Sequence, residues 1–252
     1  MLLSSPQVRT LKLTIAYDGT AYHGWQVQPG AVTVQETLES AARRFCGESF
    51  RFSASGRTDA GVHAWGQVAS WPYAGKLSPE KIRAAFNALL PYDIRVRRVE
   101  EMAADFHARM AARSKTYLYV IDNAPVANPL LRRFTWHIRQ PLDLNALRQA
   151  SLRLVGTHDF LSFKAADGES RTSERTIFQA RWRRRGALLL FFVKGDGFLK
   201  NMVRVMVGTL TECGRGKLHP SAMTRILDAR DRAAAGLTAP ASGLILRSVD
   251  YS

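Results

Sequence analysis

Hydrophobic and polar residues alternate near the start of the chain in the pattern of a half-buried β-strand. In residues 9–17, Leu11, Leu13 and Ile15 fall on one face and Lys12 falls on the other. Similar runs predict further strands at residues 50–54, 62–71, 94–99, 115–121, 175–183, 188–193 and 244–249. The chain is therefore rich in short strands, and the segments between them determine the fold class.

Apolar residues at helical spacing follow two recognisable helix starts. Thr33 and Glu36 form a capping box, and the helical pattern after it ends at Gly47. Ser78 and Pro79 open a second helix, because serine caps a first turn and proline fits the first helical position. Further helices are predicted at residues 144–155, 198–212 and 221–230.

Strands interrupted by single helices predict an α+β fold made of two α/β halves. A mostly antiparallel sheet in each half is the simplest arrangement that buries one face of every strand and helix. We expect the boundary within residues 104–113, with an N-terminal half of residues 1–108 and a C-terminal half of residues 109–252. The sequence shows no Gly/Ser-rich linker at this boundary, so the halves are expected to pack together.

Charge narrows the class of partner. The 252 residues include 36 Lys and Arg against 21 Asp and Glu, a formal net charge of +15, and 28 of the cations are arginine. Because guanidinium groups match phosphate oxygens and stack on bases, a nucleic acid is the expected partner. A generally basic surface without a specific partner is the alternative. The arginine-rich groups comprise Arg171, Arg175, Arg181, Arg183, Arg184 and Arg185, then Arg132 and Arg133, and Arg95, Arg97 and Arg98.

The same sequence disfavours membrane, secreted, disulfide-rich and metal-binding proteins. No apolar run approaches the roughly 18 residues of a membrane-spanning helix, and the first ten residues lack a signal-peptide pattern, so we expect a cytoplasmic protein. Cys46 and Cys213 stand far apart, which argues against a disulfide framework or a zinc site. His63, His107 and His158 lack metal-binding spacing, so no metal is expected.

The most informative segment is Ser55-Gly56-Arg57-Thr58-Asp59-Ala60-Gly61-Val62-His63, which lies between two predicted strands. Its two glycines flank one carboxylate, Asp59, and permit close approach of the backbone to a ligand. Arg57 favours the ionised carboxylate that a nucleophile requires. The alternative is a tight loop in which Asp59 caps backbone amides and Arg57 is solvated.

This segment closely resembles the signature of the tRNA pseudouridine synthase A family. The resemblance continues in order along nearly the whole chain, and chance does not produce agreement at so many ordered sites. The matching segments include Tyr17-Asp18-Gly19-Thr20, Gly24-Trp25-Gln26, Gly66-Gln67-Val68, Asp105-Phe106-His107-Ala108-Arg109, Lys115-Thr116-Tyr117-Leu118-Tyr119, His158-Asp159-Phe160, Ser170-Arg171-Thr172, Gly197-Phe198-Leu199, Met202-Val203-Arg204 and Gly243-Leu244.

The resemblance implies a pseudouridine synthase fold with RRM-like or ferredoxin-like sheets and a central basic cleft. It implies an isomerase that converts uridine to pseudouridine at positions 38, 39 and 40 in the anticodon stem-loop of tRNAs. It further implies a homodimer that binds tRNA and works without a cofactor or a metal. A target base in a stem must be flipped into the pocket, at a cost of a few kcal/mol of unstacking.

The family's functional residues fall on matching positions of this sequence. Its nucleophilic aspartate falls on Asp59, the tyrosine that stacks on the target base falls on Tyr117, and the arginine that pairs with the carboxylate falls on Arg204. Arg57 matches the arginine of the signature loop, and Arg57, Tyr117 and Arg204 are expected to line the cleft. Contacts to RNA are expected at Arg109, Arg171, Arg175 and His63.

Without the resemblance, the sequence indicates less specific roles for these residues. Tyr117 would be an ordinary aromatic residue of a strand. Arg204 would be a cation in an apolar helix that either extends its guanidinium to solvent or forms an ion pair. Whether Asp59 attacks the ribose C1′ or the uracil C6, and whether Tyr117 also takes the C5 proton, stays open. Ser55, Ile245 and residues 167–169 depart from the family pattern without touching the catalytic set.

Two other functions remain as alternatives. A catalytically silent RNA-binding protein on the same scaffold is disfavoured, because Asp59, Tyr117 and Arg204 are all retained. A related synthase that modifies a different RNA site is not distinguished by sequence, because the shape of the cleft and its loops determines the site. A two-domain RNA recognition module is disfavoured by the absence of its aromatic stacking motif.

Overall fold

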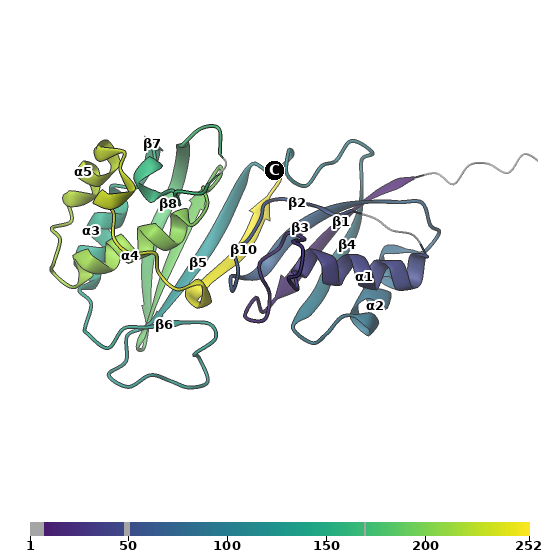
Figure 1. The fold of residues 1–252 in the computed structure, drawn as a ribbon, viewed down its shortest axis with the longest axis horizontal. Coiled ribbons are helices and arrows are strands. Elements are labelled where there is room, and N and C mark those ends of the chain that lie inside the picture. The colour runs from purple at the N-terminus through teal and green to yellow at the C-terminus, as the bar shows by residue number, and fades with distance from the viewer. Residues whose placement is uncertain (1–7, 48–50, 169) are drawn as a thin grey trace, which may run out of the picture. The chain divides into compact units, whose positions relative to one another are not determined.

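The computed structural model describes residues 8–47, 51–168 and 170–252 (Figure 1). The chain forms two compact units: unit 1 contains Met1–Arg113 and Leu246–Ser252, and unit 2 contains Ser114–Ile245. The first division therefore falls after Arg113, and the last seven residues return to unit 1, whereas halves of residues 1–108 and 109–252 stay a prediction.

Unit 1 is built on an antiparallel sheet. Strand β1 lies between β3 and β4, so that Leu13 is paired with Ala69 on one side and with Val99 on the other. The short strand β2 pairs with β3, and β10 follows β3 in the strand order. The elements of unit 1 are β1 (Arg9–Tyr17), α1 (Val34–Cys46), β2 (Ser53–Ala54), β3 (His63–Tyr73), α2 (Pro79–Leu89), β4 (Ile94–Met102) and most of β10 (Leu244–Asp250).

Both helices of unit 1 begin where their capping residues predict. The Thr33 hydroxyl accepts a hydrogen bond from the Glu36 amide at 3.3 Å, and α1 ends at Gly47 in the left-handed conformation, with φ 75°. Ser78 accepts from the Lys81 amide at 3.4 Å at the start of α2. These contacts confirm the predicted helix starts.

Unit 2 repeats the combination of an antiparallel sheet with helices. Its strand order is β5-β9-β8-β7, and β6 joins β5 in parallel. The β8–β9 hairpin closes at a turn that contains Gly186, φ 59°, where Arg185 pairs with Leu188. The helices and strands of unit 2 are β5 (Ser114–Asp122), β6 (Trp136–His137), α3 (Leu144–Leu152), β7 (Gly156–Asp159), β8 (Glu174–Arg185), β9 (Leu188–Gly195), α4 (Met202–Gly214), α5 (Ala222–Ala229) and the first residues of β10.

A few boundaries differ from the sequence prediction. The helix α3 ends at Leu152 because the chain turns at Gly156, φ 116°, into β7, which was not predicted. The helix α4 starts at Met202 because Asn201 is left-handed, φ 60°, so residues 198–201 precede the helix. The expected strand over residues 50–54 is reduced to two residues, and Phe50 lies outside the described residues.

Each unit has an apolar core. In unit 1, Trp71 and Phe86 are fully buried and their rings meet edge to face at 5.7 Å. In unit 2, Trp182 packs against Phe191 at 4.8 Å, and its indole nitrogen donates to the Ser151 hydroxyl at 2.7 Å. The predicted α+β class with mostly antiparallel sheets is confirmed. Among the helices that the structure describes, none is long and apolar enough to cross a membrane.

Candidate active site

The loop that carries Asp59 connects β2 to β3 in unit 1, and a buried polar pair fixes its start. The Ser55 hydroxyl and the Gln67 side-chain oxygen lie 2.8 Å apart, and the Gln67 side-chain nitrogen donates to the Gly56 carbonyl at 2.9 Å. Both Ser55 and Gln67 are fully buried. Because a buried hydrogen-bonded pair is costly to separate, it holds the first residues of the loop against β3.

Residues 17–25 hold the centre of the same loop. The Trp25 amide donates to the Thr58 carbonyl at 3.0 Å, and the Gly61 amide donates to the Tyr22 carbonyl at 3.2 Å. The Tyr17 hydroxyl lies 2.7 Å from the Thr58 hydroxyl, and burial raises the pKa of Tyr17 well above its usual range. The residues on either side of Asp59 are therefore fixed by three separate contacts.

Two glycines allow this close approach. A Cβ on Gly24 would lie 2.6 Å from the Thr58 carbonyl oxygen, and the φ of Gly24 is 89°. A Cβ on Gly19 would lie 2.1 Å from the Val62 carbonyl oxygen. Both positions therefore require glycine, one for space and the other for space and backbone conformation.

His63 lies directly after the loop and is only 2% exposed. Its Nδ1 accepts a hydrogen bond from the Gly19 amide at 3.0 Å and lies 3.1 Å from an Asp18 carboxylate oxygen. The structure therefore places the imidazole against the turn that follows β1, where it binds the Gly19 amide. Contact between His63 and RNA stays a prediction.

Asp59 itself is half-buried, while Arg57 is exposed. The Asp59 carbonyl accepts from the Val62 amide at 3.1 Å, which closes a turn over Ala60 and Gly61. The geometry presents a single carboxylate on a short, multiply braced loop. Such a loop suits a nucleophile, because its position is set before substrate binds.

The matched aromatic residue lies in unit 2. Tyr117 is in the middle of β5, opposite Val193 of β9, and is largely buried. Its ring meets the half-buried Phe198 edge to face at 5.1 Å. The sequence alone assigns no role to Phe198, although Gly197-Phe198-Leu199 is one of the segments that resemble the family. Together the two rings form an aromatic surface at the end of β9.

Arg204 also lies in unit 2, in the first turn of α4. Its Nε donates to the Ala239 carbonyl at 2.7 Å, and its Nη1 donates to the Asn201 side-chain oxygen at 2.9 Å. The Ala239 amide in turn donates to the Arg204 carbonyl at 3.1 Å. The guanidinium is thus held by two neutral acceptors of its own unit, and its pairing with Asp59 stays a prediction.

The arginines expected to contact RNA differ in their exposure and in their hydrogen bonds. Arg109 and Arg171 are exposed. Arg175 donates from Nη1 to the Thr172 carbonyl and hydroxyl, both at 3.2 Å, and from Nη2 to the Ser170 hydroxyl at 3.4 Å. Arg175 therefore braces the segment that presents Arg171.

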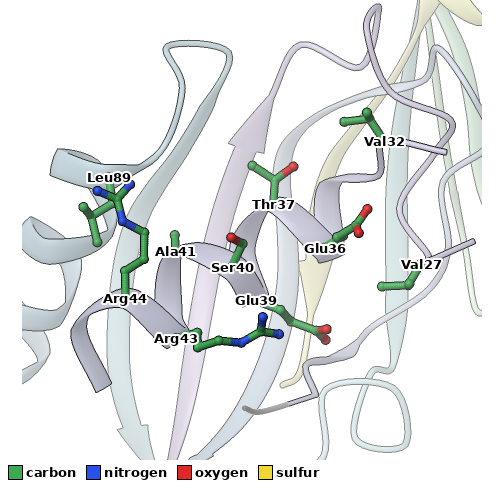
Figure 2. A pocket seen from close by; sticks show the side chains of 10 residues that line it. All are labelled: Val27, Val32, Glu36, Thr37, Glu39, Ser40, Ala41, Arg43, Arg44 and Leu89. Carbon is green, nitrogen blue, oxygen red and sulfur yellow. The ribbon is translucent and has the colours of Figure 1, made fainter. Parts of the chain in front are cut away.

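A separate pocket of about 580 Å³ lies over α1 of unit 1 (Figure 2). Along the helix, the acidic Glu36 and Glu39 and the basic Arg43 and Arg44 line it, and its apolar contacts include Val32 of the preceding loop. Opposite charges balance here, and none of the described residues that line the pocket is aromatic.

The described residues contain no group of three or more His, Cys, Asp and Glu side chains that could hold a metal ion. Burial, together with the nearby Glu212 carboxylate, raises the pKa of the Cys213 thiol to about 11, so this buried side chain is a poor ligand or nucleophile at neutral pH.

Comparison with known proteins gives consistent matches. A family model described as tRNA pseudouridine synthase matches residues 13–110 and 150–252. A tRNA pseudouridine synthase A of Pelobacter propionicus is 47% identical over 244 residues, which cover 97% of this chain and 100% of that protein. The same-named protein of Moorella thermoacetica is 49% identical over 243 residues, covering 96% and 99%, respectively. That of Brevibacillus brevis is 46% identical over 244 residues, covering 97% and 100%. The likeness extends over both units.

Proposed function

The chain belongs to the tRNA pseudouridine synthase family, and we propose that it converts uridine to pseudouridine at positions 38, 39 and 40 of the anticodon stem-loop of tRNA. In this reaction the bond between N1 of uracil and C1′ of ribose breaks, and a bond between C5 and C1′ forms. C5 loses a proton and N1 gains one, so no oxidant or reductant is consumed. The enzyme therefore needs a nucleophile, a grip on the base and a path for one proton.

The observation that carries this proposal is the braced position of Asp59. Contacts from Tyr17, Tyr22 and Trp25 fix the residues around it, while the carboxylate itself lies on a half-buried loop. We propose that this carboxylate is the nucleophile that forms a transient bond to the flipped nucleotide, at C1′ or at C6. Fixing the attacking group in advance lowers the entropic part of the barrier.

The residues of unit 2 support the remaining requirements. Flipping a base out of a stem costs a few kcal/mol of lost stacking, and stacking on Tyr117 offsets part of that cost. Phe198 holds the Tyr117 ring from its edge. We propose that Arg204 pairs with the ionised Asp59 carboxylate, because Asn201 and Ala239 fix its guanidinium in one orientation.

The number of copies in the tRNA complex and the cellular compartment are further parts of the proposal. We propose that two copies of the chain bind one tRNA and that the protein works in the cytoplasm, where tRNA is modified. The charge of +15 supports binding to a polyanion. Sedimentation of the protein with and without a tRNA transcript measures the number of copies in the complex, and a complex with a single copy contradicts the dimer.

The decisive test is tritium release from C5-labelled uridine in tRNA transcripts. Each transcript carries one labelled uridine, at position 38, 39 or 40 or at a site outside the anticodon stem-loop. The native protein should release tritium only from the first three, and Asp59→Ala should release none while still binding tRNA. Asp228→Ala serves as the control, since Asp228 is an exposed residue of α5.

Each result of this experiment has a defined meaning. Tight binding without release from any transcript by the native protein would support a silent RNA-binding protein instead. Release from another site alone would support a synthase of different site specificity. Equal release by Asp59→Ala and the native protein would remove Asp59 from the role of nucleophile.

A further inference from the structure

A basic groove lies on the sheet of unit 1, and its lining includes Gly66 of β3, a few positions after the Asp59 loop. On β1, Leu11 and Leu13 are fully buried in the core, and Lys12, between them, lies on the opposite face. The groove on this second face has a volume of about 240 Å³. Its lining residues come from β1, β3, β4 and β10 and the end of the chain, and include Lys12, Thr14, Gly66, Arg97, Arg98, Glu100, Arg247 and Tyr251.

The lining of this groove carries an excess of positive charge. It includes four cations, Lys12, Arg97, Arg98 and Arg247, against one carboxylate, Glu100. Glu100 bridges two of them, since it lies 3.0 Å from the Lys12 ammonium and 3.1 Å from the Arg98 guanidinium. These ion pairs fix the positions of Lys12 and Arg98 within the groove. A site of this kind attracts a phosphate group.

An exposed tryptophan stands beside these cations. Trp65 is 58% exposed, although it belongs to β3, whose next residues are buried. The Arg97 guanidinium lies 4.1 Å from the centroid of the indole ring, and its Nη1 donates to the Trp65 carbonyl at 3.0 Å. Arg97 therefore covers one face of the indole and fixes its position. Large exposed aromatic side chains next to a basic groove are typical of surfaces that bind unpaired nucleotides.

We propose that this groove is a second RNA-binding surface, in which Lys12, Arg97 and Arg247 hold a tRNA phosphate while an unpaired base stacks on Trp65. The inference rests on the proposed function, because a tRNA substrate supplies both the phosphates and the unpaired bases. The combination favours RNA over an acidic peptide, since a peptide carboxylate gives the indole no planar ring to stack on. The surface acts in substrate binding and leaves the chemical step to Asp59.

The chain offers a matched control for this surface. Tyr92 is 96% exposed, and the Arg95 guanidinium lies 5.1 Å from its ring centroid. This pair also lies in unit 1, but Arg95, unlike Arg97, does not line the groove. Removing the Tyr92 ring therefore measures the effect of losing an exposed aromatic ring that contacts an arginine but is not proposed to bind RNA.

The test compares Trp65→Ala, Trp65→Phe and Tyr92→Ala for the affinity of a tRNA transcript over a range of salt concentrations. Trp65→Ala should weaken binding by about tenfold or more, as expected for the loss of one stacked base. Trp65→Phe should retain most of the affinity, because it keeps an aromatic face. The double variant R97A/R247A should reduce the slope of log affinity against log salt by about 2, or about 1 for each phosphate-contacting residue.

The same measurements separate this inference from the proposed function. If the native protein releases tritium from the anticodon transcripts and Trp65→Ala binds tRNA like Tyr92→Ala, the groove has no role in RNA binding and the inference is wrong. A tenfold loss specific to Trp65→Ala, with an unchanged single-turnover rate at saturating enzyme, supports it. If R97A/R247A keeps the native salt slope, the phosphate contact is excluded.

Discussion

At the scale of single residues, several side chains near the candidate site act as supports for their neighbours. His63 holds the Gly19 amide and lies beside Asp18. Arg175 is bonded to the Ser170–Thr172 segment and thereby sets the position of Arg171. Sequence motifs mark such residues as important, but they do not distinguish a residue that touches the substrate from one that positions another.

Gly24 provides a test of how closely the Asp59 loop must be held. Gly24→Ala places a methyl group 2.6 Å from the Thr58 carbonyl oxygen at a φ of 89°. We expect this variant to lose about 1–3 kcal/mol of unfolding free energy and to react more slowly, because the loop must shift. Urea unfolding and single-turnover tritium release measure the two effects.

Gly30→Ala is the control for backbone conformation alone. Gly30 also has a positive φ, 71°, but its added Cβ would meet no atom within 4 Å. This variant should lose stability without losing rate. Similar rates for Gly24→Ala and the native protein would show that close contact with Thr58 is not needed for the reaction.

At the scale of elements, the β8–β9 hairpin separates core and basic side chains by simple alternation. Ala180 and Trp182 are buried, while Arg181 and Arg183 are exposed. The register with β9 places Arg181 opposite Phe192, and the Arg181 guanidinium lies 5.5 Å from the Phe192 ring centroid. Alternation therefore assigns the two faces correctly over residues 180–183. The same pattern places Phe178 on the core face, which is wrong, because Phe178 is 51% exposed where the register with β9 shifts between Ile177 and Gln179.

The segment before β8 presents the exposed side chain of Arg171. Arg171→Ala should weaken tRNA binding and reduce the salt slope by about 1, because the side chain is exposed on a segment braced by Arg175. Arg225→Ala, an exposed arginine of α5, is the control. Binding titrations at several salt concentrations provide the comparison. Equal slopes for the two variants would remove Arg171 from the set of phosphate contacts.

At the scale of the whole molecule, charge and buried hydroxyl groups set the response to solution conditions. A charge of +15 raises the rate of encounter with RNA at low salt. Burial raises the pKa values of Tyr17, Tyr119 and Tyr251 above their usual range. In Tyr119 the hydroxyl donates to the Pro240 carbonyl at 2.8 Å within unit 2, and in Tyr251 it donates to the Ala108 carbonyl at 2.9 Å within unit 1.

These tyrosines predict loss of stability at alkaline pH. Below a pH of about 10 the phenols are neutral in both folded and unfolded chains, so they add no pH dependence. Above this pH the unfolded chain ionises while the buried phenols stay neutral, so Tyr17 and Tyr119 should each lower the unfolding free energy by about 1.4 kcal/mol per pH unit until the folded pKa is reached. Urea unfolding at pH 8 and pH 11 tests this. Tyr119→Phe should lose less stability between the two pH values, and an equal loss in both proteins would contradict the assignment to Tyr119.

The sequence by itself determined the local structure and the family. Strand alternation predicted β1 and β8, and caps at Thr33 and Ser78 predicted two helix starts, because these signals act between residues close in the chain. The ordered motifs identified the tRNA pseudouridine synthase family, which the comparisons confirm. The motif positions also nominated Asp59, Tyr117 and Arg204, whose roles stay predictions.

Only the tertiary structure decided which residues support the loop of Asp59. The contacts of Thr58 with Tyr17, Trp25 and Gly24 join segments more than thirty positions apart, so no local pattern specifies them. The burial of His63, the return of β10 to unit 1 and the groove beside Trp65 depend on packing in the same way. Propensity and spacing act along the chain, whereas close packing and hydrogen bonding across a fold act between residues that only the folded chain brings together.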